Sequence, residues 1–427
     1  MLHIVKKKGD EEIQEQGYFA VIAFDGDGIG KWISGENTPK IQDQLARYKD
    51  EKEKGLEAYL KKLQKDQGDT EATVDTFLKT QRPVSPSYHL QLSEALSNFA
   101  LKCVKPVVDN YQGQLIYAGG DDVLALVAAT DAVNCAQDLA RVFRGINPEL
   151  KGPIIKSDIK LNALRTDDDK LLLHGDNPKT IHGYLCRTKD KAKEVFVLPG
   201  LRATASAGIA IAHSKSPLQD AVKAAQKAEK DAKHIYGKNA IAVQIVKRSG
   251  EISEWGVKLF QKGEKQDEPS SEISHGMAAL ELILQELPKP KEDKASEPES
   301  TYLSAKFPYR LQEVLDPLVN ARGMSDYNED DVSFLKLYLQ RELENNLFQN
   351  QLGTKAKNGD KGFEEFKGNL TCHLEAYLDE IKASYEKERK EKGNQSTALS
   401  LRQIQLTRLI GLLSTAAWIV TKDSSKD

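Results

Sequence analysis

The chain has 427 residues, with 61 Lys and Arg against 64 Asp and Glu, so its formal net charge is only −3. Charge balance alone therefore predicts no nucleic-acid partner, and the length predicts two or three domains. No apolar run reaches the ~18 residues of a membrane span, and the N-terminus lacks the apolar core of a signal peptide. The four cysteines include no Cys-x-x-Cys pair, which argues against a zinc site or a disulfide framework. We expect a cytoplasmic protein.

The first structured segment is expected after a polar, irregular lead-in at residues 1–16. Residues 18–24 have the pattern of a buried strand, which runs into Asp-Gly-Asp-Gly-Ile-Gly-Lys-Trp at 25–32. A strand that ends in a carboxylate offers a metal ligand, and the glycines after it offer backbone N–H groups that can wrap a phosphate. An ordinary strand-to-loop exit with acidic turn residues is the alternative.

The next predicted element is a helix that begins at Ser85-Pro86-Ser87-Tyr88, after a highly charged helical insertion at 34–83. A serine is a good N-cap and proline suits the first turn. Apolar residues spaced by three and four continue to Pro106 and indicate a core-facing side. Ser85 and His89 are four residues apart, so they share one face of this helix.

A β-hairpin is predicted where two apolar runs, 114–118 and 123–128, flank Gly119-Gly120-Asp121-Asp122. Two adjacent carboxylates repel each other unless a cation lies between them, and a divalent metal is the simplest such cation. A plain turn is the alternative. If the strand at 18–24 pairs with the hairpin, Asp25, Asp121 and Asp122 meet at one end of the sheet. That is the set of oxygen ligands that Mg²⁺ prefers.

The remaining pattern predicts an α+β fold. A helix at 132–143 is followed by a proline-rich excursion at 146–201, a strand at 203–213, a helix at 217–233 and a strand at 240–246. The order β, α, hairpin, α, β, α, β predicts a ferredoxin-like palm with helical insertions. His174, Asp176 and His182 are irregularly spaced on loop-like sequence, and we assign them no metal site.

Past residue 250 the composition changes. We predict a palm domain over 17–250 with insertions at 34–83 and 146–201, and a linker over 251–302 with one amphipathic helix. The connectors at 262–272 and 288–300 are rich in Lys, Glu, Pro and Ser. An α-helical C-terminal domain is predicted over 303–427, with helices at 311–318, 332–347, 363–383 and 398–420.

The three motifs at 25–32, 85–89 and 119–122, in this order, resemble the palm domain of nucleotidyl cyclases and polymerases. They are most similar to the second palm of the large subunit of type III, Cmr-type CRISPR effector complexes, over about residues 17–247. The resemblance implies two Mg²⁺ or Mn²⁺ ions on the catalytic residues Asp25, Asp121 and Asp122, with Asp27 as a further ligand or as a group that orients the turn.

A nucleotide-binding surface is also implied by the resemblance. Its residues are Gly26, Gly28, Ile29, Gly30, Ser85, His89, Gly119, Gly120, Lys233 and Lys238. Ser85 and His89 would line the base pocket, and the two lysines would contact the triphosphate. The turn that carries Lys238 is one residue longer than the usual cyclase spacing.

The activity implied is synthesis of cyclic oligoadenylate from ATP when target RNA is bound. The implied partners are small helical subunits, backbone subunits, guide RNA and target RNA, with no membrane. Members of the family usually carry a histidine-aspartate nuclease domain, a first palm and a zinc-bearing region before this part. None of these fits before residue 17, so we expect a split chain or a fragment without DNase activity. Its site would need a first-palm chain or a second copy, and the isolated chain is expected to be inactive.

Three alternatives stay open at this point. The chain could be a non-catalytic scaffold subunit of such a complex, or it could join ATP to S-adenosylmethionine. It could also be a stand-alone cyclic-dinucleotide cyclase. Such cyclases usually follow Gly-Gly with Asp-Glu-Phe, whereas Val123 follows Asp122 here.

Overall fold

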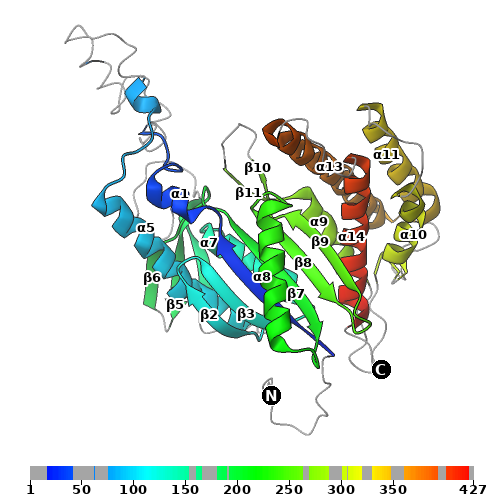
Figure 1. Ribbon diagram of the computed structural model, residues 1–427, viewed down its shortest axis with the longest axis horizontal. Helices are drawn as coiled ribbons and strands as arrows, with labels where there is room; N and C mark the ends of the chain where they lie inside the picture. The colour runs from blue at the N-terminus through cyan, green and yellow to red at the C-terminus, as the bar shows by residue number, and fades with distance from the viewer. Residues whose placement is uncertain are drawn as a thin grey trace.

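The fold is described from a computed structural model (Figure 1). It describes residues 17–41, 62, 76–152, 160–165, 180–189, 192–262, 269–287, 301–304, 306–319, 329–347, 360–392 and 401–422. The predicted lead-in at 1–16 and the connector at 288–300 lie outside these residues. So does most of the predicted insertion at 34–83.

A six-stranded sheet with the order β2-β3-β1-β7-β8-β9 forms the centre of the molecule. Its strands are β1 (Tyr18–Gly26), β2 (Gln114–Gly119), β3 (Asp122–Ala128), β7 (Ala205–His213), β8 (Ala240–Val246) and β9 (Ile252–Lys258). β7 and β8 are parallel, and the other neighbours are antiparallel. The first four strands in this order reproduce the predicted ferredoxin-like palm, so the α+β fold class is confirmed.

Helices cover both faces of the sheet, which is why the central strand β1 is apolar on both sides. Ile22 and Phe24 face α7 (Ala132–Phe143) within the main core, whereas Val21 and Ala23 face α8 (Leu218–His234). α8 lies very close to β7 at Gly208. A Cβ there would lie 2.1 Å from the carbonyl oxygen of Ala225, so only glycine permits this contact.

One long helical segment leads to the hairpin. It consists of α5 (Pro86–Asn98), a π-helical stretch (Phe99–Val104) and α6 (Lys105–Asn110). We predicted that it ends at Pro106, but it continues to Asn110. Proline has no N–H to donate within a helix, and the wider π-helical turns lie directly before it.

The excursion at 146–201, predicted as loop-like, contains a second sheet. Its strands β4 (Lys160–Arg165), β5 (Thr180–Lys189) and β6 (Ala192–Val197) are antiparallel in that order. The amide of Asn98 donates to the carbonyl of Val197 at 3.0 Å, and Lys102 pairs with Glu194 at 2.6 Å. These contacts join the small sheet to the α5 segment. Of the unassigned trio, His182 lies in β5, and His174 and Asp176 lie outside the described residues.

The boundary predicted at residue 251 is wrong, because residues 252–258 form β9 and pair with β8. Only Trp255, Gly256 and Val257 of β9 are buried, so this segment lacks the longer apolar run by which the other central strands could be predicted. It is followed by the strand pair β10 (Phe260–Lys262) and β11 (Pro269–Ile273) and by α9 (His275–Glu286). The predicted amphipathic helix is therefore present, but the chain before it belongs to the palm.

The C-terminal part is helical, as predicted, and it packs on the β9 side of the sheet (Figure 1). It contains α10 (Phe307–Val319), α11 (Glu329–Arg341) with a π-helical end (Glu342–Leu347), α13 (Lys361–Lys392) and α14 (Leu401–Lys422). A Cβ on Gly411 of α14 would lie 2.8 Å from the ring of Trp255 in β9. The two parts thus share one hydrophobic core. None of the described helices is long and apolar enough to cross a membrane.

Candidate metal and nucleotide site

The structure brings the three predicted catalytic aspartates to one end of the sheet. Phe24 of β1 is paired with Val123 of β3, so the neighbouring Asp25 and Asp122 lie at the same end of these strands. Asp121 lies in the β2–β3 turn beside Gly26. A Cβ on Gly26 would lie 2.9 Å from the Cβ of Asp121 and 3.0 Å from its Oδ2. Two segments about 95 residues apart therefore meet only because position 26 has no side chain.

The hairpin carboxylates are in an unfavourable electrostatic environment. Burial raises the pKa of Asp121, and the charge of Asp122 raises it further, although a backbone hydrogen bond opposes this. Burial also raises the pKa of Asp122. Groups whose ionised form is disfavoured in this way are relieved by a nearby cation.

Lys233 of α8 brings a cation to Asp25 at this end of the sheet. Its Nζ pairs with Oδ2 of Asp25 and lies 2.6 Å from Oε1 of Glu229. Burial and the charge of Lys238 lower the pKa of Lys233 to about 8. Burial, Asp122 and Asp27 raise the pKa of Glu229, so this carboxylate belongs to the same charged cluster. We did not predict Glu229, although its position four residues before Lys233 on one helix was a usable signal.

Asp27 is held by the protein rather than left open to a metal. It is 6% exposed. Its carboxylate accepts hydrogen bonds from Thr204 Oγ1 at 2.8 Å, Ser206 Oγ at 2.7 Å and the backbone N–H of Asn239 at 2.7 Å. Of the two roles predicted for Asp27, these contacts favour orientation of the loop over metal ligation, because its oxygens already have protein donors.

The glycine loop and the turn with Lys238 face each other. Gly28 adopts a left-handed conformation (φ 67°) and caps α1 (Ile29–Ser34). A Cβ on Gly28 would lie 3.7 Å from Nζ of Lys238. Nζ of Lys258 donates to the carbonyl oxygens of Gly237 and Lys238 at 2.5 and 2.8 Å and braces this turn. The longer turn thus still directs Lys238 to the glycine loop.

Ser85 and His89 lie at the exposed start of α5, which docks on α1. The Ser85 hydroxyl accepts a hydrogen bond from the backbone N–H of Tyr88 at 3.2 Å, as predicted for an N-cap. The Tyr88 hydroxyl donates to the carbonyl oxygen of Trp32 at 2.9 Å. In the hairpin, Gly119 is paired with Asp122, and Gly120 is left-handed (φ 66°).

The donor set fits Mg²⁺ or Mn²⁺ in chemistry, since it offers carboxylate oxygens at one end of the sheet and two aspartates whose ionised form is disfavoured by burial. The geometry is not that of a closed coordination shell. Among the described residues, no group of three or more His, Cys, Asp or Glu side chains is arranged to hold a metal ion. Asp25 is paired with Lys233 instead. A metal bound by all three aspartates would have to displace this ammonium group.

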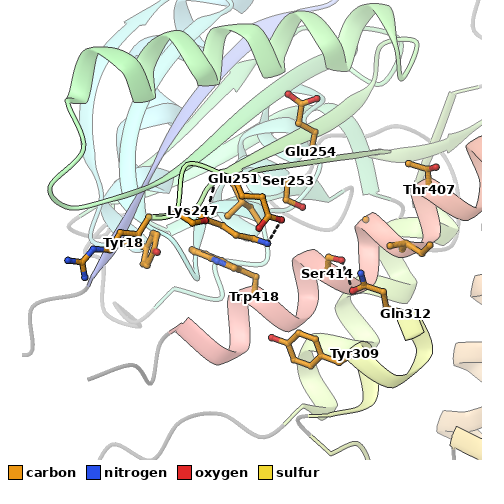
Figure 2. A pocket seen from close by; sticks show the side chains of 15 residues that line it. Tyr18, Lys247, Glu251, Ser253, Glu254, Tyr309, Gln312, Thr407, Ser414 and Trp418 are labelled. Carbon is orange, nitrogen blue, oxygen red and sulfur yellow. Dashed lines mark hydrogen bonds and ion pairs between the residues drawn. The ribbon is translucent and has the colours of Figure 1, made fainter. Parts of the chain in front are cut away.

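A separate cleft of about 610 Å³ lies at the other end of β1, between the β8–β9 turn, α10 and α14 (Figure 2). Tyr18, Tyr309 and Trp418 line it together with the ion pair of Lys247 and Glu251, whose charged atoms are 2.7 Å apart. None of the predicted site residues lines this cleft.

A ferredoxin-like sheet with acidic residues at the hairpin turn and at the end of the adjacent central strand defines a palm domain. Residues 18–155 and 183–242 match the family described as "Cas10/Cmr2, second palm domain". These residues, a little under half of the chain, are assigned to the second palm of that family.

Two curated relatives are similar to the chain. The CRISPR system Cmr subunit Cmr2 of Pyrococcus furiosus is 29% identical over 234 residues, which are 55% of this chain and 19% of that protein. The Cmr2 subunit of Saccharolobus solfataricus is 34% identical over 73 residues, 17% of this chain and 7% of that protein. The matches thus span less than a fifth of either relative.

Two solved structures were also matched. The chain is 17% identical, with a TM-score of 0.47, to a chain of the type III-B Cmr-beta cryo-EM structure in the apo state. It is 15% identical, with a TM-score of 0.46, to a chain of the Cmr-beta structure bound to cognate target RNA. Each match covers 80% of this chain and 35% of the other chain.

Proposed function

We propose that the chain is a nucleotidyltransferase subunit of an RNA-guided type III CRISPR complex, which makes cyclic oligoadenylate from ATP with Mg²⁺ or Mn²⁺. The observation that supports this most strongly is the meeting of Asp25, Asp121 and Asp122 at one end of a family palm. Bound metal ions would activate a ribose hydroxyl and stabilise the departing pyrophosphate.

The chain's own residues divide the remaining work. Asp25, Asp121 and Asp122 would hold the metal ions, and Asp27 would keep the end of β1 in place through its three protein donors. Lys233 and Lys238, on two sides of the glycine loop, would neutralise the triphosphate. Ser85 and His89 at the exposed start of α5 would contact the base.

The proposal includes partners, because the matched segment is a small part of its relatives. Both curated relatives are named as subunits of CRISPR Cmr systems, and we therefore propose a place beside other Cmr subunits, guide RNA and target RNA. A second palm, from another chain or a second copy, would hold the acceptor nucleotide.

The test is ATP turnover by the assembled complex. Labelled ATP, Mg²⁺ or Mn²⁺ and target RNA would be incubated with complexes that contain the wild-type chain or the double variant D121A/D122A. We expect the double variant to assemble normally and to lose product by at least ~100-fold. The control is E364A/E365A, which removes two adjacent exposed carboxylates at the start of α13. Undiminished product from D121A/D122A would contradict the catalytic role and favour a non-catalytic scaffold subunit. If the wild-type complex made a product only when S-adenosylmethionine was added, the reaction would be the joining of ATP to S-adenosylmethionine.

A further inference from the structure

Arg144, at the C-terminal end of α7, is a buried cation that binds carbonyl oxygens and forms no ion pair with a carboxylate of the described residues. It is 2% exposed, and its Nη1 has no hydrogen-bond partner in the part of the chain that the structure describes. Its other nitrogens bind carbonyl oxygens. Nε and Nη2 lie 3.1 and 2.9 Å from the oxygen of Leu201, and Nη2 lies 2.6 Å from that of Ser270.

This arrangement is unfavourable for stability alone. Burial lowers the pKa of Arg144 to about 10, because a charge held only by dipoles loses most of its hydration. The carbonyl end of α7 compensates for part of this loss. An apolar side chain of similar volume would avoid the desolvation penalty, at the cost of the hydrogen bonds to the carbonyls of Leu201 and Ser270. The presence of a guanidinium at this position is therefore better explained by the segments that it links.

Arg144 contacts two segments that are far apart in the sequence. Its guanidinium binds the carbonyl of Leu201, just before β7, and lies over the ring of Phe260 in β10, 4.2 Å from the ring centroid. The Phe260 carbonyl in turn accepts a hydrogen bond from the side chain of Asn239 at 3.0 Å. Arg144 thus links the segment before β7 to β10, and Phe260 of β10 binds the side chain of Asn239.

Both segments lead to a hydrogen-bond donor of the Asp27 carboxylate. Thr204, three residues after Leu201, donates to Oδ2 of Asp27 at 2.8 Å, and the backbone N–H of Asn239 donates to the same oxygen at 2.7 Å. The N–H of Asp27 also donates to the carbonyl of Thr204 at 2.8 Å. Asp27 follows Asp25 by two residues, so its position fixes the end of β1.

We propose that Arg144 is a positioning residue of the metal site. By joining the Leu201 segment to Phe260, it fixes the donors that hold Asp27, and through Asp27 it orients Asp25 toward Asp121 and Asp122. This inference rests on the proposed function, because it requires that Asp25 binds a metal ion.

The test is Mn²⁺ binding by the full chain, measured from the electron paramagnetic resonance signal of free Mn²⁺. In R144M we expect the dissociation constant to rise about tenfold, as for other residues that orient metal ligands. Because R144M takes a donor from the carbonyls of Leu201 and Ser270, the melting temperature is also expected to fall. Mn²⁺ binding is therefore compared at a temperature at which both proteins are fully folded, where a purely structural cation would leave it unchanged. The control is R141M on the same helix. The Arg141 side chain pairs with Glu149 at 2.5 Å instead of binding the Leu201 segment or Phe260, so its loss should leave Mn²⁺ binding unchanged.

A double-mutant cycle tests the route. T204V removes one donor to Asp27 and should also weaken Mn²⁺ binding. If Arg144 acts through this segment, the double variant R144M/T204V should bind about as weakly as the weaker single variant. If the fold-losses in Mn²⁺ affinity of the two single variants multiply in the double variant, the two residues act independently and the proposed route is wrong. R144K keeps the charge but cannot span both carbonyls and the ring, so a smaller loss is expected, and this variant decides the question if R144M does not fold.

The outcomes separate this inference from the proposed function. Mn²⁺ binding that is lost in D25N but unchanged in folded R144M or R144K overturns the role of Arg144 alone. Binding that is equally strong in the wild type and D25N places the metal elsewhere, and it overturns both the proposed site and the role of Arg144.

Discussion

Lys233 on α8 forms an ion pair with Asp25 at the end of β1, so one of the predicted metal ligands is already held by a cation of the protein. The same ammonium group lies 2.6 Å from Glu229, one helical turn earlier. A divalent metal and Lys233 would therefore compete for Asp25. Glu229 would keep the displaced ammonium beside the site, where a triphosphate could bind it.

Replacing Lys233 by methionine should affect metal and nucleotide in opposite directions. K233M removes the competitor for Asp25, so we expect Mn²⁺ to bind about threefold more tightly. It also removes a positive charge near the triphosphate, so we expect ATP affinity to fall about tenfold. Calorimetric titration of the full chain with each ligand checks both. K223M, on the exposed side of the same helix, is the control. If the affinities for Mn²⁺ and ATP changed in the same direction, Lys233 and the metal would not compete for Asp25.

A methyl group at position 26 should disturb the site without changing its charge. The Cβ of G26A would lie 2.9 Å from the Cβ of Asp121 and 2.8 Å from Cγ1 of Ile29, so Asp121 would have to move. We expect Mn²⁺ affinity to fall about tenfold. G30A is the matched control, because a Cβ at Gly30 meets nothing within 4 Å and alanine favours a helix by about 1 kcal/mol. Equal metal affinity in both variants would show that Asp121 is not a ligand.

As the pH is lowered, metal binding should begin to weaken at a higher pH than it would at a site made of ordinary aspartates. Burial raises the pKa of Asp121 and of Asp122, so at a given pH more of each carboxyl is protonated. A proton must leave before the metal binds, and therefore affinity should fall as the pH drops through these raised values, above the usual ~3.9, and should level off at higher pH. Mn²⁺ titrations between about pH 4 and pH 8 measure this. A curve that stays flat down to the usual value would contradict the raised pKa values.

Asp27 should matter for stability as well as for the metal. D27N replaces an acceptor of three hydrogen bonds by an amide whose NH₂ group faces donors. Because an unsatisfied buried group costs roughly 1–3 kcal/mol, we expect the free energy of unfolding to fall by about 2 kcal/mol in urea titrations. D109N is the control, since Asp109 forms an exposed pair with Lys105 at 2.8 Å. If D27N lost metal binding at unchanged stability, Asp27 would be a ligand after all.

Much of the palm could be predicted from the sequence because its signals are local. The helix at 132–143 and the strand at 240–246 have the bounds that we predicted. The Gly-Gly-Asp-Asp turn also fixed the hairpin, and hence the end of the sheet to which Asp121 and Asp122 belong. Pairing of β1 with β3 then follows from the ferredoxin-like order, which is a general rule of topology.

The features that the sequence did not predict depend on contacts between residues far apart in the chain. β9 has polar residues on its exposed side and is recognisable only through its pairing with β8. Arg144 looks like any charged residue at a helix end, and its importance arises from carbonyls 57 and 126 residues away. The pairing of Lys233 with Asp25 spans 208 residues. No local pattern reports such contacts.

The most direct test of the site is the position of the metal itself. Crystals of the full chain with Mn²⁺ and a non-hydrolysable ATP analogue would be examined by anomalous diffraction at the manganese edge. We predict an anomalous peak bound by Asp25, Asp121 and Asp122, with the ammonium of Lys233 moved from Asp25 to the phosphates. A nucleotide-bound structure in which Lys233 still pairs with Asp25, and in which manganese lies elsewhere or nowhere, would contradict it.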